Sequence, residues 1–169
     1  AFAEAGGVIY AECGGLMYLS LSIQTKVSQY RMAGVYPFRT RMGSKMHMGY
    51  VTVTTQQGCS VFPENATICG QVYHLSEIVQ ERVMRTIGDV ASSEGYWEGF
   101  RATMEAPGSK PMEEGYSYKN ALATSIHLHW AHDPQLAEGF VAQCHEVGAA
   151  GRVEAAVAEE LGRAAHGAG

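Results

Sequence analysis

The stretch from Ala11 to Gly15 has the residue types and the spacing of a sharp turn that carries a nucleophile. Its sequence, Ala-Glu-Cys-Gly-Gly, places small residues two positions away from Cys13 on each side. Such a turn holds its central residue in a strained conformation, so small neighbours are needed where strand and helix approach each other. The start of a helix favours a thiolate, and the N–H groups of Gly14 and Gly15 can hold an oxyanion. The same spacing also fits a packed core thiol beside a simple Gly-Gly turn.

Further polar candidates lie in the segment 122–130. Strand alternation puts His127 and His129 on one face of this segment, opposite an apolar face. The pair has three interpretations: a base for Cys13, a metal pair or a structural pair. A metal site needs at least one more ligand, and no Asp or Glu stands at a matching spacing, so we expect no metal.

His74 is a second supporting candidate, in the predicted strand 68–76. It fits equally well as an edge histidine that is hydrogen-bonded to a neighbour. The central glycine of this strand, Gly70, indicates a close approach of a ligand or of another backbone.

The elements that must position these residues follow from the apolar pattern. Val8 to Tyr10 suits a buried strand, and a helix is expected from Leu16 until it fades near 23–26. Asp133 and Pro134 are typical of a helix N-terminus. Further strands are predicted over 30–36, 50–55, 68–76, 96–103 and 115–130, a basic loop over 39–45, and helices over 77–87 and 153–164.

Composition limits the class of protein. The chain has 169 residues, 46% hydrophobic and 17% charged, with a formal net charge of -5, which argues against nucleic acid as a partner. The apolar runs are too short for a membrane span, and the four cysteines lack the spacing of a zinc site or a disulfide scaffold. We expect a soluble cytoplasmic protein with reduced thiols, although an organelle would suit the sequence as well.

The arrangement of Cys13, His127 and the following Asp133-Pro134 resembles the glutaminase half of cobyrinic acid a,c-diamide synthases. These are triad, class I-like glutamine amidotransferases of cobalamin biosynthesis. The segment 11–19, Ala-Glu-Cys-Gly-Gly-Leu-Met-Tyr-Leu, matches the nucleophile motif of that family residue for residue. The resemblance covers roughly 7–144.

The resemblance implies an α/β fold in three layers, with a mostly parallel central sheet of flavodoxin-like type. We expect an amidotransferase domain over 1–147 that lacks its N-terminal part; outside the resemblance, composition predicts a Gly/Ala-rich tail with a weak helix over 148–169. Cys13 would be the nucleophile and His127 its base, because the histidine of the family follows a Ser-aliphatic pair.

The implied reaction is the hydrolysis of L-glutamine, with ammonia passed to the carboxylates of a corrin precursor such as cobyrinate or hydrogenobyrinate. ATP and Mg²⁺ would act in a separate synthetase domain or subunit, so that no cofactor is expected in this chain. A homodimer is a further expected assembly.

Several positions depart from the pattern of the family. His129 stands where other triad amidotransferases have a Glu that orients the histidine. The Arg-Gly-His-Glu-aromatic-His pattern reads here as 69–74, Cys-Gly-Gln-Val-Tyr-His, and no GxxxxGK[ST] phosphate loop occurs. An upstream glycine turn that would supply a second oxyanion donor is missing. Two alternatives therefore stay open: a catalytically impaired module that binds a subunit, or a related amidotransferase with another acceptor.

Overall fold

The computed structural model describes residues 1–57, 59–79, 96–104 and 110–166. The first elements are strand β1 (Ile9–Glu12), helix α1 (Gly14–Leu19) and the strands β2 (Ser22–Gln24) and β3 (Gln29–Arg31). Two long strands follow, β4 (Arg39–Thr55) and β5 (Thr67–Val79). The C-terminal part contains β6 (Tyr96–Met104), β7 (Met112–Tyr118), β8 (Ala121–Thr124), β9 (Ile126–Leu128), a 3₁₀ turn (Trp130–His132) and helix α3 (Pro134–His166).

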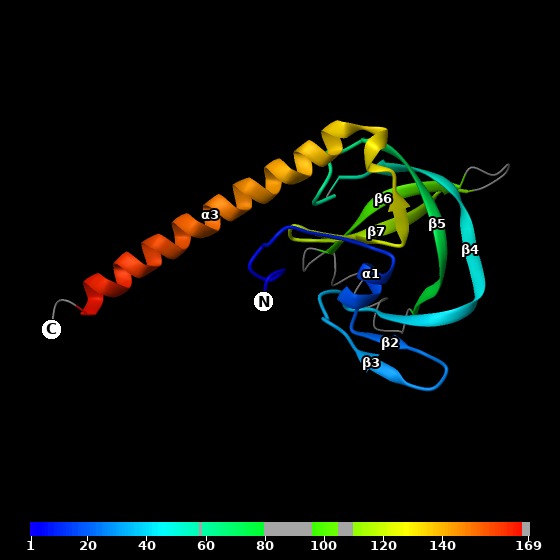
Figure 1. The fold of residues 1–169 in the computed structure, drawn as a ribbon, viewed down its shortest axis with the longest axis horizontal. Coiled ribbons are helices and arrows are strands. Elements are labelled where there is room, and N and C mark those ends of the chain that lie inside the picture. Colours follow the sequence, from blue (N-terminus) through cyan, green and yellow to red (C-terminus); the bar gives the residue numbers. More distant parts are fainter. Residues whose placement is uncertain (58, 80–95, 105–109, 167–169) are drawn as a thin grey trace.

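The strands form one mixed sheet in the order β1-β8-β7-β6-β4-β2-β3, and β5 joins it by pairing with both β4 and β9. Within the described ranges, β1 with β8 and β2 with β4 pair in parallel, and the remaining neighbours pair antiparallel. Long strands β4 and β5 curve strongly around the body of the molecule (Figure 1).

The sheet curls so that β8 and β9 come together near Ser125. Pairing leads from β8 through β7, β6, β4 and β5 to β9, and only Ser125 separates β9 from β8 along the chain. The chain therefore leaves the neighbourhood of β1 and joins the edge of β5 within one residue.

The α/β class is as expected, but the three-layer, mostly parallel, flavodoxin-like arrangement is not confirmed. The physical reason is the length of the connections. Parallel neighbours need long crossovers, usually helices, whereas here short links join β6 to β7 and β7 to β8, which favours antiparallel pairing.

Four local predictions need correction. The helix after Cys13 ends at Leu19, because the chain is already extended as β2 from Ser22. The basic segment 39–45 lies within β4 and is not a loop. The helix predicted over 77–87 is wrong over 77–79, because these residues are the last three of β5. Its remaining residues, 80–87, lie outside the described residues. The strand expected over 30–36 is only the short β3.

Two apolar clusters fill the interior. One contains Val51 and Val53 of β4 together with Ile126 and Leu128 of β9. The other contains Ala11 and Leu16, the residues that flank the Cys13 turn, with Tyr36 and Phe38 packed against them. The turn between β1 and α1 is therefore anchored on both sides in the second cluster.

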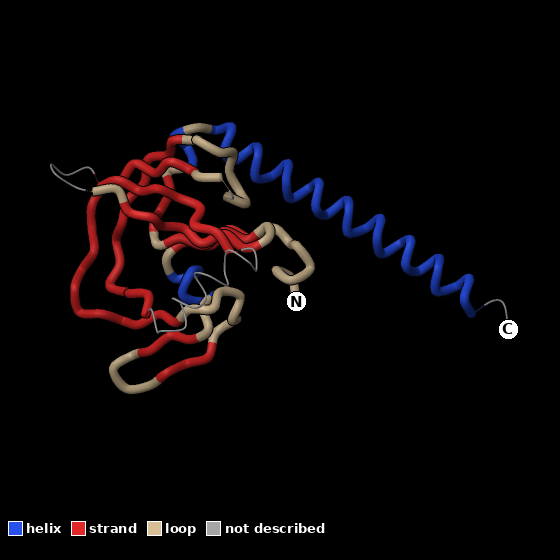
Figure 2. The backbone as a smooth tube through the Cα atoms, turned by 180° about the vertical axis from the view of Figure 1, so that it is seen from behind, coloured by secondary structure: helices blue, strands red, loops and turns tan. Residues whose placement is uncertain are grey.

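Helix α3 begins against this core and then projects away from it (Figures 1 and 2). Asp133 caps its start as predicted, with its Oδ1 accepting from the Gln135 N–H at 3.0 Å. Leu136 is buried in the first cluster. The expected separate tail helix over 153–164 is instead the last part of one continuous helix through Gly148 and Gly151.

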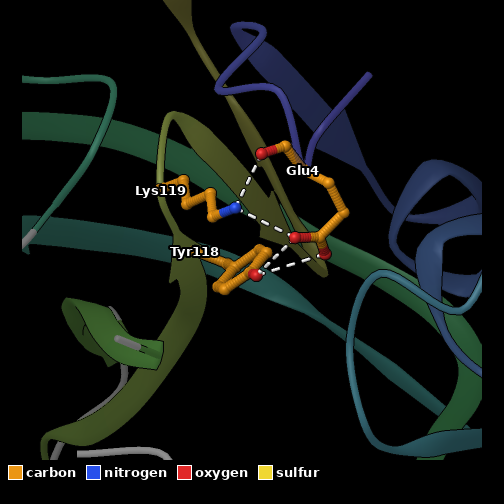
Figure 3. Close-up of polar contacts among 3 residues, drawn as sticks. All are labelled: Glu4, Tyr118 and Lys119. Carbon is orange, nitrogen blue, oxygen red and sulfur yellow. Dashed lines mark hydrogen bonds and ion pairs between the residues drawn. The ribbon is translucent and has the colours of Figure 1, made fainter. Parts of the chain in front are cut away.

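The N-terminal segment is fastened to the turn between β7 and β8 by polar contacts (Figure 3). The Glu4 carboxylate accepts from Tyr118 Oη at 2.9 Å and from Lys119 Nζ at 2.9 Å. Asn120 donates to the Gly6 carbonyl at 2.7 Å. These bonds lead the chain into β1, whose first N–H, that of Ile9, donates to the Asn120 carbonyl at 3.0 Å.

Candidate functional site

Cys13 occupies a strained turn between β1 and α1. Its backbone has φ 48° and ψ −102°, outside the regions that an L-residue prefers. Its N–H donates to the Thr124 carbonyl at 2.8 Å, and its own carbonyl accepts from the Met17 N–H at 3.2 Å. The first bond continues the parallel pairing of β1 with β8, and the second begins α1. The strand–cysteine–helix order predicted from the sequence is confirmed.

The small residues around Cys13 are required by contact. A Cβ added to Gly15 would lie 3.1 Å from the Ala11 Cβ, closer than ordinary van der Waals contact. Gly14 has open space around it and is exposed. As the first residues of α1, Gly14 and Gly15 have N–H groups that no helical carbonyl can accept from. The start of α1 at these two glycines is as the sequence analysis expected.

His127 is brought to this turn by the β8–β9 segment. Thr124, the backbone partner of Cys13, lies three residues before it, and the register of β5 and β9 places His127 opposite Gln71. The His127 side chain is 36% exposed, and Ile126 and Leu128 on either side are buried. The predicted alternation is confirmed over 126–129, but the continuous strand predicted over 115–130 is wrong, because a turn at 119–120 and the break at Ser125 divide it into β7, β8 and β9.

A direct contact joins the cysteine turn to the histidine strand. The Nδ1 of His127 lies 3.4 Å from Oε2 of Glu12, the residue before Cys13. The other oxygen of Glu12, Oε1, accepts from the Leu128 N–H at 2.9 Å and from Tyr10 Oη at 2.5 Å. One carboxylate therefore bridges β1 and β9 beside both candidate residues.

The ring of Tyr10 is held in an aromatic cluster under this carboxylate. It meets Trp130 edge-on at 4.8 Å between centroids, with Phe62 at 5.8 Å and Phe140 at 6.4 Å. Burial, and then the hydrogen bond to Glu12, raise the pKa of Tyr10 well above its usual range. Tyr10 therefore stays a neutral donor to Glu12.

A second carboxylate stabilises the break between β8 and β9. Glu114 of β7 is buried, and its Oε1 accepts from the N–H and the hydroxyl of Ser125, both at 2.8 Å. Its Oε2 accepts from the Thr124 hydroxyl at 2.5 Å. The Ile126 N–H also donates to Thr124 Oγ1. Because these four donors at the break have local acceptors, the chain can change its sheet partner there.

The two supporting candidates lie apart from this contact. His129 is exposed, and its backbone N–H donates to the Cys69 carbonyl at 2.9 Å. His74 on β5 contacts the Ser76 carbonyl through Nδ1 at 2.9 Å, and its ring stacks on His47 of β4 with centroids 5.2 Å apart. These contacts fit the interpretation of His74 as a hydrogen-bonded edge histidine.

Gly70 marks a close approach of backbones, as expected from its place in the strand. A Cβ there would lie 2.8 Å from a methyl group of Ile126 and 2.9 Å from the His127 carbonyl. The approach allows β9 to lie against β5. The neighbouring Gln71, opposite His127, stands where the resembling family has a histidine.

A cavity of about 540 Å³ opens beside these elements. Its lining combines residues of β4, β5 and β7 with Leu16 of α1 and with Ser125 and Ile126. Cys13, Gly14, Gly15 and His127 are not among its lining residues; the nearest lining positions along the chain are Leu16, three residues after Cys13, and Ser125, two before His127. His74 and Glu114 also contribute to the wall.

The four thiols differ in environment. All are free; Cys144 is exposed on α3, and the other three are half-buried. Burial raises the pKa of Cys59, which makes it a poor nucleophile. In the described part of the chain, no group of three His, Cys, Asp or Glu side chains could hold a metal ion. No helix there is both long and apolar enough to cross a membrane.

Glu12, Tyr10 and Glu114 were missed by the sequence analysis. Two signals were available for the first two: Tyr10 and Glu12 share one face of the predicted strand, and Glu12 directly precedes Cys13. Glu114 could be found only from the fold, because its partners lie on another strand.

The chain is similar in sequence to known proteins of one family. A family model described as the CobB/CobQ-like glutamine amidotransferase domain matches residues 1–135. A cobyrinate a,c-diamide synthase from Syntrophotalea carbinolica is 33% identical over 145 residues, which cover 85% of this chain and 29% of that protein. The synthase from Archaeoglobus fulgidus is 30% identical over 141 residues, covering 83% and 28%.

The chain thus spans less than a third of the length of these relatives. The match nevertheless covers the cysteine turn, β8, β9 and the start of α3. This chain belongs to the family of CobB/CobQ-like glutamine amidotransferase domains.

Proposed function

We propose that this chain hydrolyses glutamine, with Cys13 as the nucleophile and His127 as the general base and acid. The observation that carries the proposal is the strained Cys13 backbone, fixed to Thr124 three residues before His127. Strain at a single residue is costly, about 1–3 kcal/mol, and is concentrated at functional sites. A core thiol would need no such conformation.

The chemistry follows from these groups. The thiolate of Cys13 attacks the side-chain amide carbon of glutamine, and the N–H groups of Gly14 and Gly15 stabilise the oxyanion that forms. The C–N bond then breaks, His127 gives its proton to the leaving ammonia, and a γ-glutamyl thioester remains. Water loses a proton to His127 and attacks the thioester, which releases glutamate and the thiolate.

A cavity near the cysteine turn offers enough room for a substrate the size of glutamine. Its volume of about 540 Å³ lies within the range of about 300–1,000 Å³ of small-molecule sites. By this proposal the glutamine side chain extends past Leu16 and Ser125 toward Cys13.

The acceptor is inferred from the names of the relatives. Because they are cobyrinate a,c-diamide synthases, we propose that the ammonia amidates carboxylates of a corrin precursor in cobalamin biosynthesis. ATP and Mg²⁺ would activate those carboxylates in a synthetase part, since this chain has no GxxxxGK[ST] phosphate loop. The residues of this chain would then act on glutamine alone, which requires no cofactor.

Release of glutamate from glutamine tests the proposal. The purified chain is assayed alone and together with an ATP-dependent synthetase part, and Cys13→Ser and His127→Ala are compared with the unchanged chain. We expect each change to lower kcat about 10³-fold or more. Cys144→Ser, the control, changes an exposed thiol on α3 and should leave the rate unchanged. Equal rates for Cys13→Ser and the unchanged chain would refute the proposal.

One observation favours a different function, that of a non-catalytic binding module. Gln71 stands directly opposite His127, where the resembling family has a histidine, so the surroundings of the candidate base are altered. A module of this kind would release no glutamate, yet would still bind a synthetase part.

A further inference from the structure

We propose that Glu12 is the positioning residue of His127, in the role that a Glu two residues after the histidine has in other triad amidotransferases. This inference rests on the proposed function. It is carried by a set of contacts that converge on one carboxylate: Oε2 toward His127 Nδ1, and Oε1 toward two donors.

Two donors fix the orientation of the Glu12 carboxylate. Tyr10 Oη and the Leu128 N–H both donate to Oε1, at 2.5 Å and 2.9 Å, so Oε2 is left directed at His127. The Glu12 side chain is 26% exposed. Hydrogen bonds to a charged acceptor are stronger than neutral ones, and restricted access to water strengthens them further.

The Glu12 carboxylate influences the tautomer and the charge of His127. A carboxylate beside Nδ1 favours the tautomer with its proton on Nδ1, which leaves Nε2 free to accept a proton. It also stabilises the imidazolium that forms when the base has taken that proton. The separation of 3.4 Å is long for a hydrogen bond, and such contacts often shorten once a substrate is bound.

The Glu12 carboxylate is itself supported by the packing around Tyr10. The ring of Tyr10 packs edge-on against Trp130, Phe62 and Phe140, which restricts the movement of its hydroxyl. His129, at the position two after the histidine, is exposed and contributes a backbone bond to Cys69. The fold therefore offers Glu12 as the orienting carboxylate.

The test is the kinetics of Glu12→Gln, Glu12→Asp and Tyr10→Phe in glutamate release. We expect Glu12→Gln to lower kcat about 10²-fold with KM within twofold, less than the ~10⁴-fold loss in a Ser-His-Asp triad because the contact is longer. Glu12→Asp should recover part of that loss. Tyr10→Phe should lower kcat by a smaller factor in the same direction.

Tyr118→Phe is the matched control, because it also removes a Tyr–Glu hydrogen bond, that to Glu4, outside the site. It should leave kcat and KM unchanged. An unchanged kcat in Glu12→Gln, or a change confined to KM, would overturn the positioning role.

A spectroscopic measurement separates positioning from folding. The ¹⁵N shifts of His127 report its tautomer, and they are recorded in Cys13→Ala with and without Glu12→Gln. We expect the Nδ1–H tautomer with Glu12 present and a mixture without it. Identical shifts would overturn the proposal even if Glu12→Gln were unstable. Equal rates of glutamate release in Cys13→Ser and the unchanged chain would instead count against the proposed function. The two failures can therefore be told apart.

Discussion

The conformation of Cys13 distinguishes this residue from the other cysteines of the chain. A positive φ of 48° with ψ −102° places a side-chain-bearing residue where glycine is preferred. The neighbouring Ala11 and Gly15 permit that geometry, since a Cβ added at Gly15 would lie only 3.1 Å from the Ala11 Cβ. The strain is therefore built into the turn.

This strain gives a stability prediction with an unusual sign. Both Cys13→Gly and Cys13→Ala remove the thiol, but only glycine adopts a positive φ without cost. We expect Cys13→Gly to be more stable than Cys13→Ala by about 1 kcal/mol in urea unfolding. Gly139→Ala in helix α3 is the control; there alanine should be the more stable residue by about 0.5–1 kcal/mol. A Cys13→Ala variant more stable than Cys13→Gly would contradict a strained turn.

Glu4 provides a pH prediction at the same scale. The hydrogen bond from Lys119, together with that from Tyr118, lowers the pKa of Glu4 below its usual 4.5. A lowered folded-state pKa means that the contact stabilises the fold above pH 4.5 and that this contribution is lost as the pH falls through the lower value. The side chains of Glu4 and Lys119 are exposed, at 60% and 41%, so the effect of their contact on stability is small.

The measurement is a carboxyl NMR titration of Glu4 in the unchanged chain and in Lys119→Met. The variant should titrate at a higher pH, closer to 4.5. Glu64→Gln, at an exposed turn, should leave the titration of Glu4 unmoved. Superimposable curves for Lys119→Met and the unchanged chain would argue against the contacts in Figure 3.

At the scale of elements, the site depends on how closely β9 lies against β5. Gly70 allows this approach, because an added Cβ would lie 2.9 Å from the His127 carbonyl. We expect Gly70→Ala to destabilise the fold by about 1–3 kcal/mol in urea unfolding. It should also lower kcat for glutamate release by displacing the strand that carries His127.

The comparison variant for Gly70 is Gly151→Ala in α3, where a new Cβ meets nothing within 4 Å. It should not lower stability. A Gly70→Ala protein with unchanged stability and kcat would mean that β9 has room to move without consequence.

The elements near Cys13 could be predicted because their signals are local. The strand before Cys13, the small residues around the thiol and the alternation over 126–129 each depend on a short segment, and each is found, although the strand begins at Ile9 and is half-buried. The contact of Glu12 with His127 could not be predicted, because it depends on the parallel register of β1 with β8. The mixed sheet was missed for a similar reason: strand direction is set by pairing over long distances, not by local pattern.

At the scale of the whole molecule, helix α3 divides into a packed start and a projecting remainder (Figure 1). Leu136 is buried, Phe140 packs against the core, and Gln143 donates to the Ser60 carbonyl at 2.8 Å. Most residues over 144–151 are exposed. The helix therefore continues well beyond the part that contacts the body.

This division predicts two opposite outcomes in thermal unfolding. Leu136→Ala should destabilise the fold by about 2–5 kcal/mol, because it leaves a cavity in the core. Removal of 149–169 should leave both the melting temperature and glutamate release nearly unchanged. A large loss of stability on truncation would show that the projecting helix contributes to the fold.

The most direct test of the Cys13–His127 site is covalent labelling by an electrophilic glutamine analogue, a diazoketone, followed by mass spectrometry of the peptides. We predict stoichiometric labelling of Cys13, slowed strongly in His127→Ala and blocked by excess glutamine, with Cys144 unlabelled. Label distributed over exposed thiols, or absent from Cys13 in the presence of a synthetase part, would contradict a catalytic Cys13 and leave the non-catalytic module as the better description.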